Sequence, residues 1–194
     1  MRLVLDVENT VTHRDGKLHL DPFESKNHLV QVGMLDADDP KATLKIVTLD
    51  HNESKDDTGF GKLEIQWTLD NTKLLIMHNA QHDLMWLWEC GFKYDGDIYD
   101  TMLGEYILDR GQRNGLSLEA CAERRQLSYK KQDTLKKYFK EGKNTNEIPY
   151  EELCTYLRYD LLTTCELFHA QEKDYSKTDA KSLNTIRRVT FNTC

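Results

Sequence analysis

The stretch RLVLDVENT, residues 2–10, places an acidic pair directly after an apolar run. Leu3, Val4 and Leu5 predict a buried strand, and Asp6 and Glu8 follow two residues apart. Side chains with this spacing on a strand point to the same side. In a chain with 33 acidic residues such a triplet is expected by chance, so the pair gains meaning only if other acids join it.

The composition predicts one globular domain with no membrane partner. Of 194 residues, 39% are hydrophobic and 30% are charged, which suits a single core. No apolar run is long enough to span a membrane, and Asp6 interrupts the first apolar run too early for a signal peptide. The five cysteines form no C-x-x-C pair, which favours a reduced, cytoplasmic location over a disulfide scaffold or a zinc site.

The formal net charge of −7 disfavours a protein that coats nucleic acid by bulk electrostatics. Nucleic acid stays open as a substrate, because a site made of carboxylates reverses its local charge when it binds divalent cations.

The first half of the chain has the pattern of strands. Strands are predicted over residues 3–7, 28–36, 43–50 and 73–79, the last as a continuous apolar run typical of a strand buried on both faces. The segment ADDPK is predicted as a turn and residues 51–62 as a loop, whereas residues 62–71 fit either a strand or a short helix.

The second half has helical periodicity. Helices are predicted from Ala80 to Gly91, from an N-cap at Asp100, from an N-cap at Ser117 and from Pro149 to Tyr175. The order of elements predicts an α/β domain with a mixed sheet and flanking helices.

Three further residues could join the acidic pair. Asp83 falls on the first turn of the helix after the 73–79 strand, and Tyr156 and Asp160 lie four residues apart on one face of the last helix. Buried carboxylates without compensation are costly. Convergence of these acids would therefore predict a site for Mg²⁺ or Mn²⁺, and two such ions could support in-line attack on a phosphodiester.

The segments LDVENT, HNAQHDLMWL and YLRYDLLTTCEL resemble the three motifs of the DnaQ-like, DEDD superfamily of 3′–5′ exonucleases. The spacing of Tyr156 and Asp160 resembles its tyrosine-containing (DEDDy) branch. The stretches IYDTMLGEYILDRG and LSLEACAERRQL resemble the proofreading domains of family A DNA polymerases. The resemblance implies a ribonuclease H-like fold with a five-stranded mixed sheet.

The resemblance also implies roles for individual residues. Asp6, Glu8 and Asp160 would bind the first metal ion, and Asp6 would bridge to a second ion that Asp83 reaches directly or through water. Tyr156 would orient the attacking water. The implied cofactors are two Mg²⁺ or Mn²⁺ ions, and the implied substrate is a single-stranded or frayed DNA 3′ end, cut to 5′-mononucleotides.

Three positions are implied to contact the terminal nucleotide. Asn79 matches the asparagine of the second motif. His82 stands where the family usually has Tyr or Phe, and Thr12 stands where related polymerases often carry a wedging leucine, with Val11 beside it. These two departures from the family pattern affect how firmly the terminal nucleotide would be bound, and neither removes a metal ligand.

The resemblance predicts an exonuclease domain over residues 1–174. Residues 175–194 are then expected to begin the linker or thumb of a longer DNA polymerase, with a rough apolar face of Leu183, Ile186, Val189 and Phe191.

Several alternatives stay open on the sequence alone. His78 and His82 beside Asp83 could indicate a zinc or general-base histidine, and the basic run at 124–140 could be a solvated face or a path for phosphates. The three tryptophans could be core residues or stacking platforms. At the level of function, the rivals are a ribonuclease D-like RNA-trimming enzyme and a catalytically silent binding or scaffolding domain.

Overall fold

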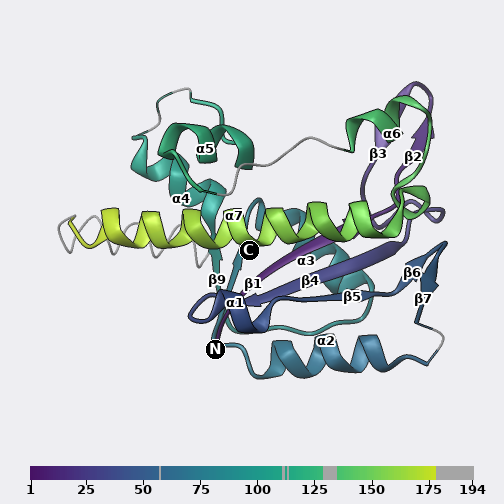
Figure 1. The fold of residues 1–194 in the computed structure, drawn as a ribbon, viewed down its shortest axis with the longest axis horizontal. Coiled ribbons are helices and arrows are strands. Elements are labelled where there is room, and N and C mark those ends of the chain that lie inside the picture. The colour runs from purple at the N-terminus through teal and green to yellow at the C-terminus, as the bar shows by residue number, and fades with distance from the viewer. Residues whose placement is uncertain (57, 111, 113, 129–134, 178–194) are drawn as a thin grey trace.

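A five-stranded mixed sheet lies at the centre of the computed structural model, which describes residues 1–56, 58–110, 112, 114–128 and 135–177 (Figure 1). The strand order is β5-β4-β1-β8-β9, with β1 at Arg2–Asn9, β4 at Leu29–Asp36, β5 at Lys45–Thr48, β8 at Leu74–Met77 and β9 at Asp97–Asp100. β4 runs antiparallel to both β1 and β5, whereas β1, β8 and β9 are parallel. The predicted fold class is confirmed.

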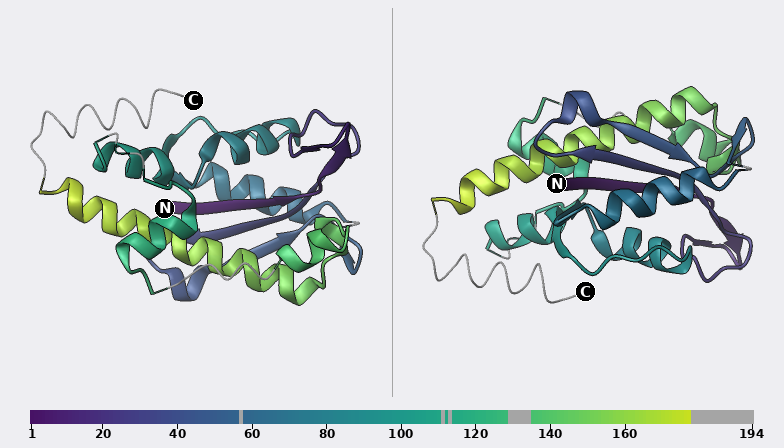
Figure 2. Two further views of the ribbon diagram at one scale, coloured as in Figure 1. Left: turned by 90° about the horizontal axis from the view of Figure 1, so that it is seen from above. Right: turned by 90° about the horizontal axis from the view of Figure 1, so that it is seen from below.

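Helices cover both faces of the sheet (Figure 2). On one face, α2 (Phe60–Asp70) and α3 (Ala80–Glu89) enclose a core that includes Leu3, Leu5 and Val7. On the other face, the long helix α7 (Tyr150–Tyr175) packs over Val4 through Leu157 and Leu161. Successive residues of β1 therefore supply both cores, as the alternation along a strand requires.

The smaller elements stand at the ends of the sheet. Two short hairpins are formed by β2 (Thr12–Arg14) with β3 (Lys17–His19) and by β6 (Asp50–His51) with β7 (Ser54–Lys55). The remaining helices are α1 (Pro40–Thr43), α4 (Thr101–Leu108), α5 (Leu118–Arg125), α6 (Lys136–Lys140) and the 3₁₀ turn η1 (Thr145–Glu147). Within the described residues, no helix is long and apolar enough to cross a membrane.

Several local predictions were wrong. The predicted turn ADDPK runs into the short helix α1, because Pro40 suits the first helical position. Residues 51–62, predicted as a loop, contain most of the β6–β7 hairpin and the start of α2. The segment 62–71, for which a strand or a short helix was open, is helical as far as Asp70. Strand β9 was not predicted, since only Ile98 and Tyr99 mark its four residues as apolar. The expected apolar face at 183–191 lies outside the described residues.

The predicted caps are confirmed, and one of them does more than the sequence indicated. Ser117 accepts a hydrogen bond from the amide of Ala120 at the start of α5. Asp100 caps α4 by accepting from the amides of Met102 and Leu103, and it also accepts from the amides of Asn79 and Ala80 at the start of α3. This buried carboxylate therefore joins the N-termini of two helices.

A buried charge cluster fastens α4 and α5 to α7. Glu105 is 1% exposed, and its carboxylate accepts from Arg124 at 3.0 Å, from Arg125 at 2.7 Å and from the side-chain Nε2 of Gln171 at 2.9 Å. Arg124 and Arg125, the first two cations of the basic run at 124–140, therefore stabilise the fold. Residues 129–134 of that run lie outside the described residues.

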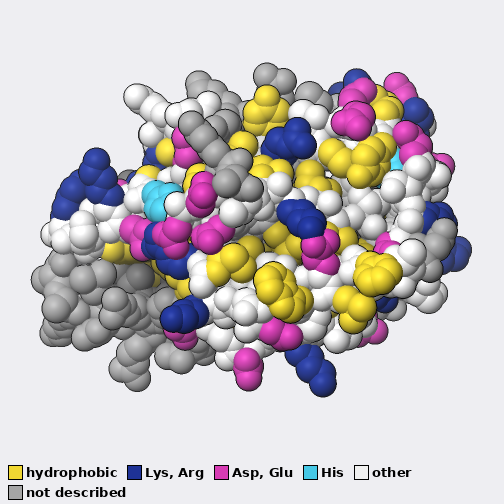
Figure 3. Space-filling view, turned by 60° about the horizontal axis from the view of Figure 1, so that its bottom comes forward, with side chains coloured by type: hydrophobic (Ala, Val, Ile, Leu, Met, Phe, Trp, Pro, Cys, Tyr) yellow, Lys and Arg dark blue, Asp and Glu magenta, His cyan; other side chains and the backbone are white. Residues whose placement is uncertain are grey.

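Charged side chains of both signs are interspersed with hydrophobic ones on the face that carries α2 (Figure 3). The most exposed of these apolar residues on α2 are Phe60, Leu63 and Trp67. Scattered exposed apolar residues are normal on a protein surface.

Replacing Glu105 by alanine should lower the free energy of unfolding by about 3–5 kcal/mol, because two arginines and a glutamine would lose their buried acceptor. Urea unfolding of Glu105→Ala measures this loss. Glu123→Ala, which removes an exposed acid from neighbouring α5, is the matched control and should change stability little. Equal losses in both variants would contradict the structural role assigned to Glu105.

Candidate metal centre

The carboxylates of three predicted metal ligands lie close together. One carboxylate oxygen from each of Asp6, Glu8 and Asp160 lies within 4.8 Å of the others. Asp6 and Glu8 share the face of β1 on which α7 packs, and Asp160 extends from α7 onto that face. Among the described residues, this all-carboxylate group is the one arrangement of three or more potential ligands that could hold a metal ion.

The fourth acid, Asp83, reaches the same region from the other side of β1. Strand β8 pairs with β1 only over Arg2–Val4, so the later part of β1 extends past its neighbour. There the amide of Val7, between Asp6 and Glu8, donates to Oδ1 of Asp83 at 3.1 Å. The buried end of β1 therefore has Asp83 directly beside it, although Asp83 is not part of the three-carboxylate group.

The electrostatics of Asp83 reflect this crowding. Burial raises the pKa of its carboxyl well above the usual range, and the nearby negative charge of Asp6 raises it further. A divalent cation would offset both effects. The donor set is made of carboxylate oxygens, which fits Mg²⁺ or Mn²⁺ and does not fit a thiolate- or imidazole-preferring metal.

Tyr156 lies beside the cluster, one helical turn before Asp160. Burial, the neighbouring charges of Asp160, Glu8 and Asp6, and a hydrogen bond with Asp160 all raise the pKa of its hydroxyl. A phenol in such surroundings stays protonated and can act as a hydrogen-bond donor.

Close approach of α7 to the sheet depends on a glycine. Gly33 on β4 stands opposite Asp6 in the antiparallel register. A Cβ atom at this position would lie 2.7 Å from Cδ1 of Leu161 and 2.9 Å from Cγ of Leu157. The missing side chain therefore allows α7 to bring Asp160 down to Asp6 and Glu8.

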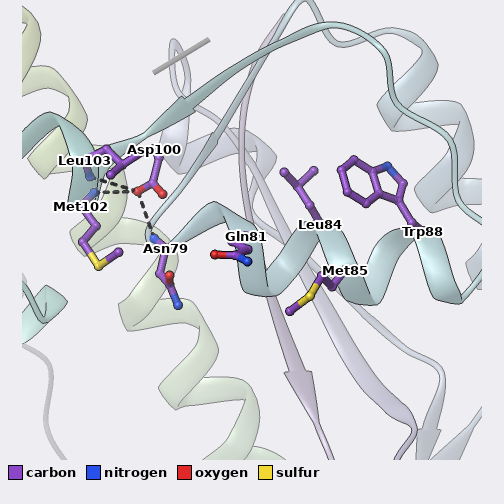
Figure 4. A pocket seen from close by; sticks show the side chains of 8 residues that line it. All are labelled: Asn79, Gln81, Leu84, Met85, Trp88, Asp100, Met102 and Leu103. Atoms are coloured by element: carbon purple, nitrogen blue, oxygen red, sulfur yellow. Dashed lines mark hydrogen bonds between the residues drawn. The ribbon is translucent and has the colours of Figure 1, made fainter. Parts of the chain in front are cut away.

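Two of the predicted substrate contacts, Asn79 and Thr12, lie on chain segments next to those that carry the acids. Asn79 is exposed at the start of α3 with a left-handed backbone (φ 67°) and borders a cavity of about 350 Å³ (Figure 4). Thr12 is half-buried on β2 and donates its hydroxyl hydrogen to Asn27 at 2.7 Å. The structure thus places both residues near chain segments that carry the acids, and their contact with a substrate remains a prediction.

His82 also has a defined partner. The side-chain nitrogen Nδ2 of Asn9 donates to the carbonyls of Thr10 and Leu20. The side-chain oxygen Oδ1 of Asn9 therefore faces Nε2 of His82, at 3.0 Å. Nε2 is therefore the protonated nitrogen, and burial lowers the pKa of the imidazole. His82 ties α3 to the end of β1.

The histidine alternative for the site is not supported. Both ring nitrogens of His78 are used, at 2.8 Å from the hydroxyl of Thr101 and at 2.9 Å from the carbonyl of Leu116. The candidate metal ligands in the described part of the chain include no histidine.

Sequence reasoning missed one further residue, which holds the segment that follows Glu8. The side chain of Asn144, just before η1, accepts from the amide of Val11 at 2.9 Å and donates to its carbonyl at 2.8 Å. It thereby joins the segment after Glu8 to the segment that leads into α7. Its capping box with Glu147 was the available signal in the sequence.

Comparison with known proteins identifies the family. A family model described as 3′–5′ exonuclease matches residues 41–175, a segment that includes Asp83, Tyr156 and Asp160 and begins after Asp6 and Glu8. No curated protein matches the chain in sequence.

Solved structures share the fold at low sequence identity. One described as the apo form of a nuclease has a TM-score of 0.67 at 12% identity, covering 97% of this chain and 79% of that chain. Brucella melitensis NrnC has a TM-score of 0.61 at 16% identity, and its structure with bound Mg²⁺ has 0.60 at 15%. Each covers 97% of this chain and 81% of the other.

The variant Gly33→Ala should weaken metal binding while the protein still folds. Overpacking should cost about 1–3 kcal/mol and displace α7 from β1, which separates Asp160 from Asp6 and Glu8. The measurement is the rise in melting temperature on adding Mn²⁺, since a ligand of the native state stabilises it by mass action.

Gly104→Ala is the matched control for this prediction. A Cβ there would also crowd α7, at 2.8 Å from the side chain of Gln171, three turns away from Asp160. We expect a similar loss of stability with an intact Mn²⁺ response. An unchanged Mn²⁺ response in Gly33→Ala would show that α7 is not needed to complete the site.

Proposed function

Since this chain belongs to the 3′–5′ exonuclease family, we propose that it removes 5′-mononucleotides from the 3′ ends of single-stranded or frayed DNA. The observation that carries the proposal is the convergence of Asp6, Glu8 and Asp160 on one point, with Asp83 beside them. The first two of these residues lie outside the segment that the family model matches, so the fold supports their assignment independently.

The proposed ligands divide between two Mg²⁺ or Mn²⁺ ions. Asp6, Glu8 and Asp160 would hold one ion, and Asp6 and Asp83 the other. When bound, such ions lower the pKa of water and stabilise charge on the attacking and leaving oxygens of a phosphodiester. The protein contributes a fixed arrangement of carboxylates on β1, α3 and α7, so little reorganisation is needed when the substrate binds.

Tyr156 would act through its hydroxyl. Because the surrounding carboxylates and burial keep it protonated, it can donate a hydrogen bond to the attacking water or to a phosphate oxygen. Its place one turn before Asp160 orients it toward the same point.

Asn79, His82 and Thr12 would position the terminal nucleotide. Asn79 presents an exposed amide at the start of the helix that carries Asp83. His82 would act mainly by holding the end of β1 through Asn9, and Thr12 by the hairpin that follows β1.

We further propose that the domain proofreads for a DNA polymerase in the same full-length chain. The resemblance of the α4 and α5 sequences to the proofreading domains of family A polymerases supports this role. A ribonuclease D-like enzyme is the second candidate, because the acidic motifs do not encode the preference for deoxyribose or ribose.

Digestion of a 5′-labelled DNA single strand with Mg²⁺ should give a ladder that shortens from the 3′ end. The double variant Asp6→Ala, Glu8→Ala should give no ladder, because it removes two of the three clustered carboxylates. An RNA strand of the same sequence, digested in parallel, separates the two candidates. Faster digestion of RNA would replace the DNA proposal, and an equal ladder from the double variant would overturn the assigned site.

Tyr156→Phe should lower kcat by about 10²-fold with little change in KM, since it removes a hydrogen-bond donor at the reacting centre and keeps the packed ring. Steady-state kinetics on the labelled strand measure both constants. Tyr159→Phe, at an exposed position of the same helix, is the control and should match the wild type. Wild-type kcat in Tyr156→Phe would refute a role for the hydroxyl.

A further inference from the structure

The outer side of α3 borders a cavity. Of the residues given a role in the proposed function, Asn79 alone lines it. Gln81, Met85 and Trp88 follow one another at helical spacing along it, and Met102 of α4 faces the start of the row (Figure 4). The cavity has a volume of about 350 Å³. Trp88 remains 48% exposed at the far end of the row, so its indole is available to a ligand.

The position of this cavity relative to the metal centre follows from helix geometry. Gln81 and Asp83 are two residues apart on α3, about 3 Å along the axis and on opposite sides of it. Asp83 faces β1, whereas Gln81 faces the cavity. Asn79 stands at the start of the helix and borders the cavity as well.

The lining has the chemistry of a site for a nucleobase. An indole and two thioethers offer an apolar surface for a flat ring, and the side-chain amide of Gln81 offers a donor and an acceptor to its edge. The one acid in the lining, Asp100, already accepts hydrogen bonds from four backbone amides. None of the described residues that line the cavity is a lysine or an arginine, which disfavours a phosphate as the occupant.

We propose that this cavity holds an unpaired base of the substrate strand, upstream of the nucleotide being removed, with the base stacked on Trp88. The proposal rests on the function proposed above and adds a subsite to it. A strand with its 3′ end at Asp83 passes Asn79 at the start of α3 and reaches the cavity on the other side of the helix. Because stacking is available to every base, the subsite would hold the strand with little sequence preference.

The expected effect of Trp88→Ala is about a tenfold rise in KM for a DNA single strand with kcat nearly unchanged, since the variant removes the aromatic face on which the base stacks. Trp88→Phe keeps an aromatic face and should recover most of the affinity. Trp67→Ala is the matched control, because Trp67 is 66% exposed on α2 and does not border the cavity.

A second arm identifies the nucleotide. Single abasic positions are placed second, third, fourth or fifth from the 3′ end of the same labelled strand, and the first cleavage is timed. At one position the missing base should raise the wild-type KM about tenfold and leave the KM of Trp88→Ala unchanged, since the stacking partner is already gone. Additive effects at every position, or a wild-type KM in Trp88→Ala, would overturn the subsite.

Failure of the proposed function can be told apart from failure of the subsite. If the wild type cuts no strand, tryptophan fluorescence is titrated with the uncut DNA strand. Quenching in the wild type and in Trp67→Ala that is absent in Trp88→Ala supports the subsite without exonuclease activity. No quenching of Trp88 overturns it.

Discussion

Mutual repulsion among like charges is the constraint on which the arrangement depends. One oxygen from each of three carboxylates lies within 4.8 Å of the others, and a fourth acid, Asp83, lies beside them with a raised pKa. The fold has to hold these groups together against repulsion whenever no cation compensates them. It does so by distributing the four acids over three rigid supports: β1 for Asp6 and Glu8, α3 for Asp83 and α7 for Asp160.

Two features of packing let these supports converge. Strand β1 extends beyond its parallel neighbour β8, and the amide exposed there takes Asp83 as its acceptor. On the other face, Gly33 leaves room for Leu157 and Leu161, so α7 lies close to the strand that pairs with β1. One residue of β1 thus meets α3 while the next meets α7. The strand acts as the common reference for both helices, which explains why the acidic pair is placed near its carboxyl end.

The sequence was sufficient to predict the elements with a strong hydrophobic periodicity and the positions of the acids on them. The burial of Leu153, Leu157 and Leu161 follows from their spacing in α7, and the same spacing aligned Tyr156 with Asp160. The sequence could not show that Gly33 stands opposite Asp6, because strand register is a tertiary property. For the same reason the second use of Asp100 and the link from Asn144 to Val11 were not predictable. Short elements such as β9 and the β6–β7 hairpin carry too few residues for a period to emerge.

Asp100 would also limit how this domain could hold the nucleic acid strand proposed as its substrate. The N-terminus of a helix is often a phosphate site, because its first amides have no partner within the helix. In this protein the amides of Asn79 and Ala80 already donate to Asp100, and the same carboxylate caps α4. An incoming phosphate would have to displace a buried charge. Under the proposed function, side chains on the outer surface of α3 would then hold the strand, which favours stacking and amide contacts over backbone anion binding. Such a mode of binding also suits a chain with a net charge of −7, since it relies less on cationic residues and on counterion release.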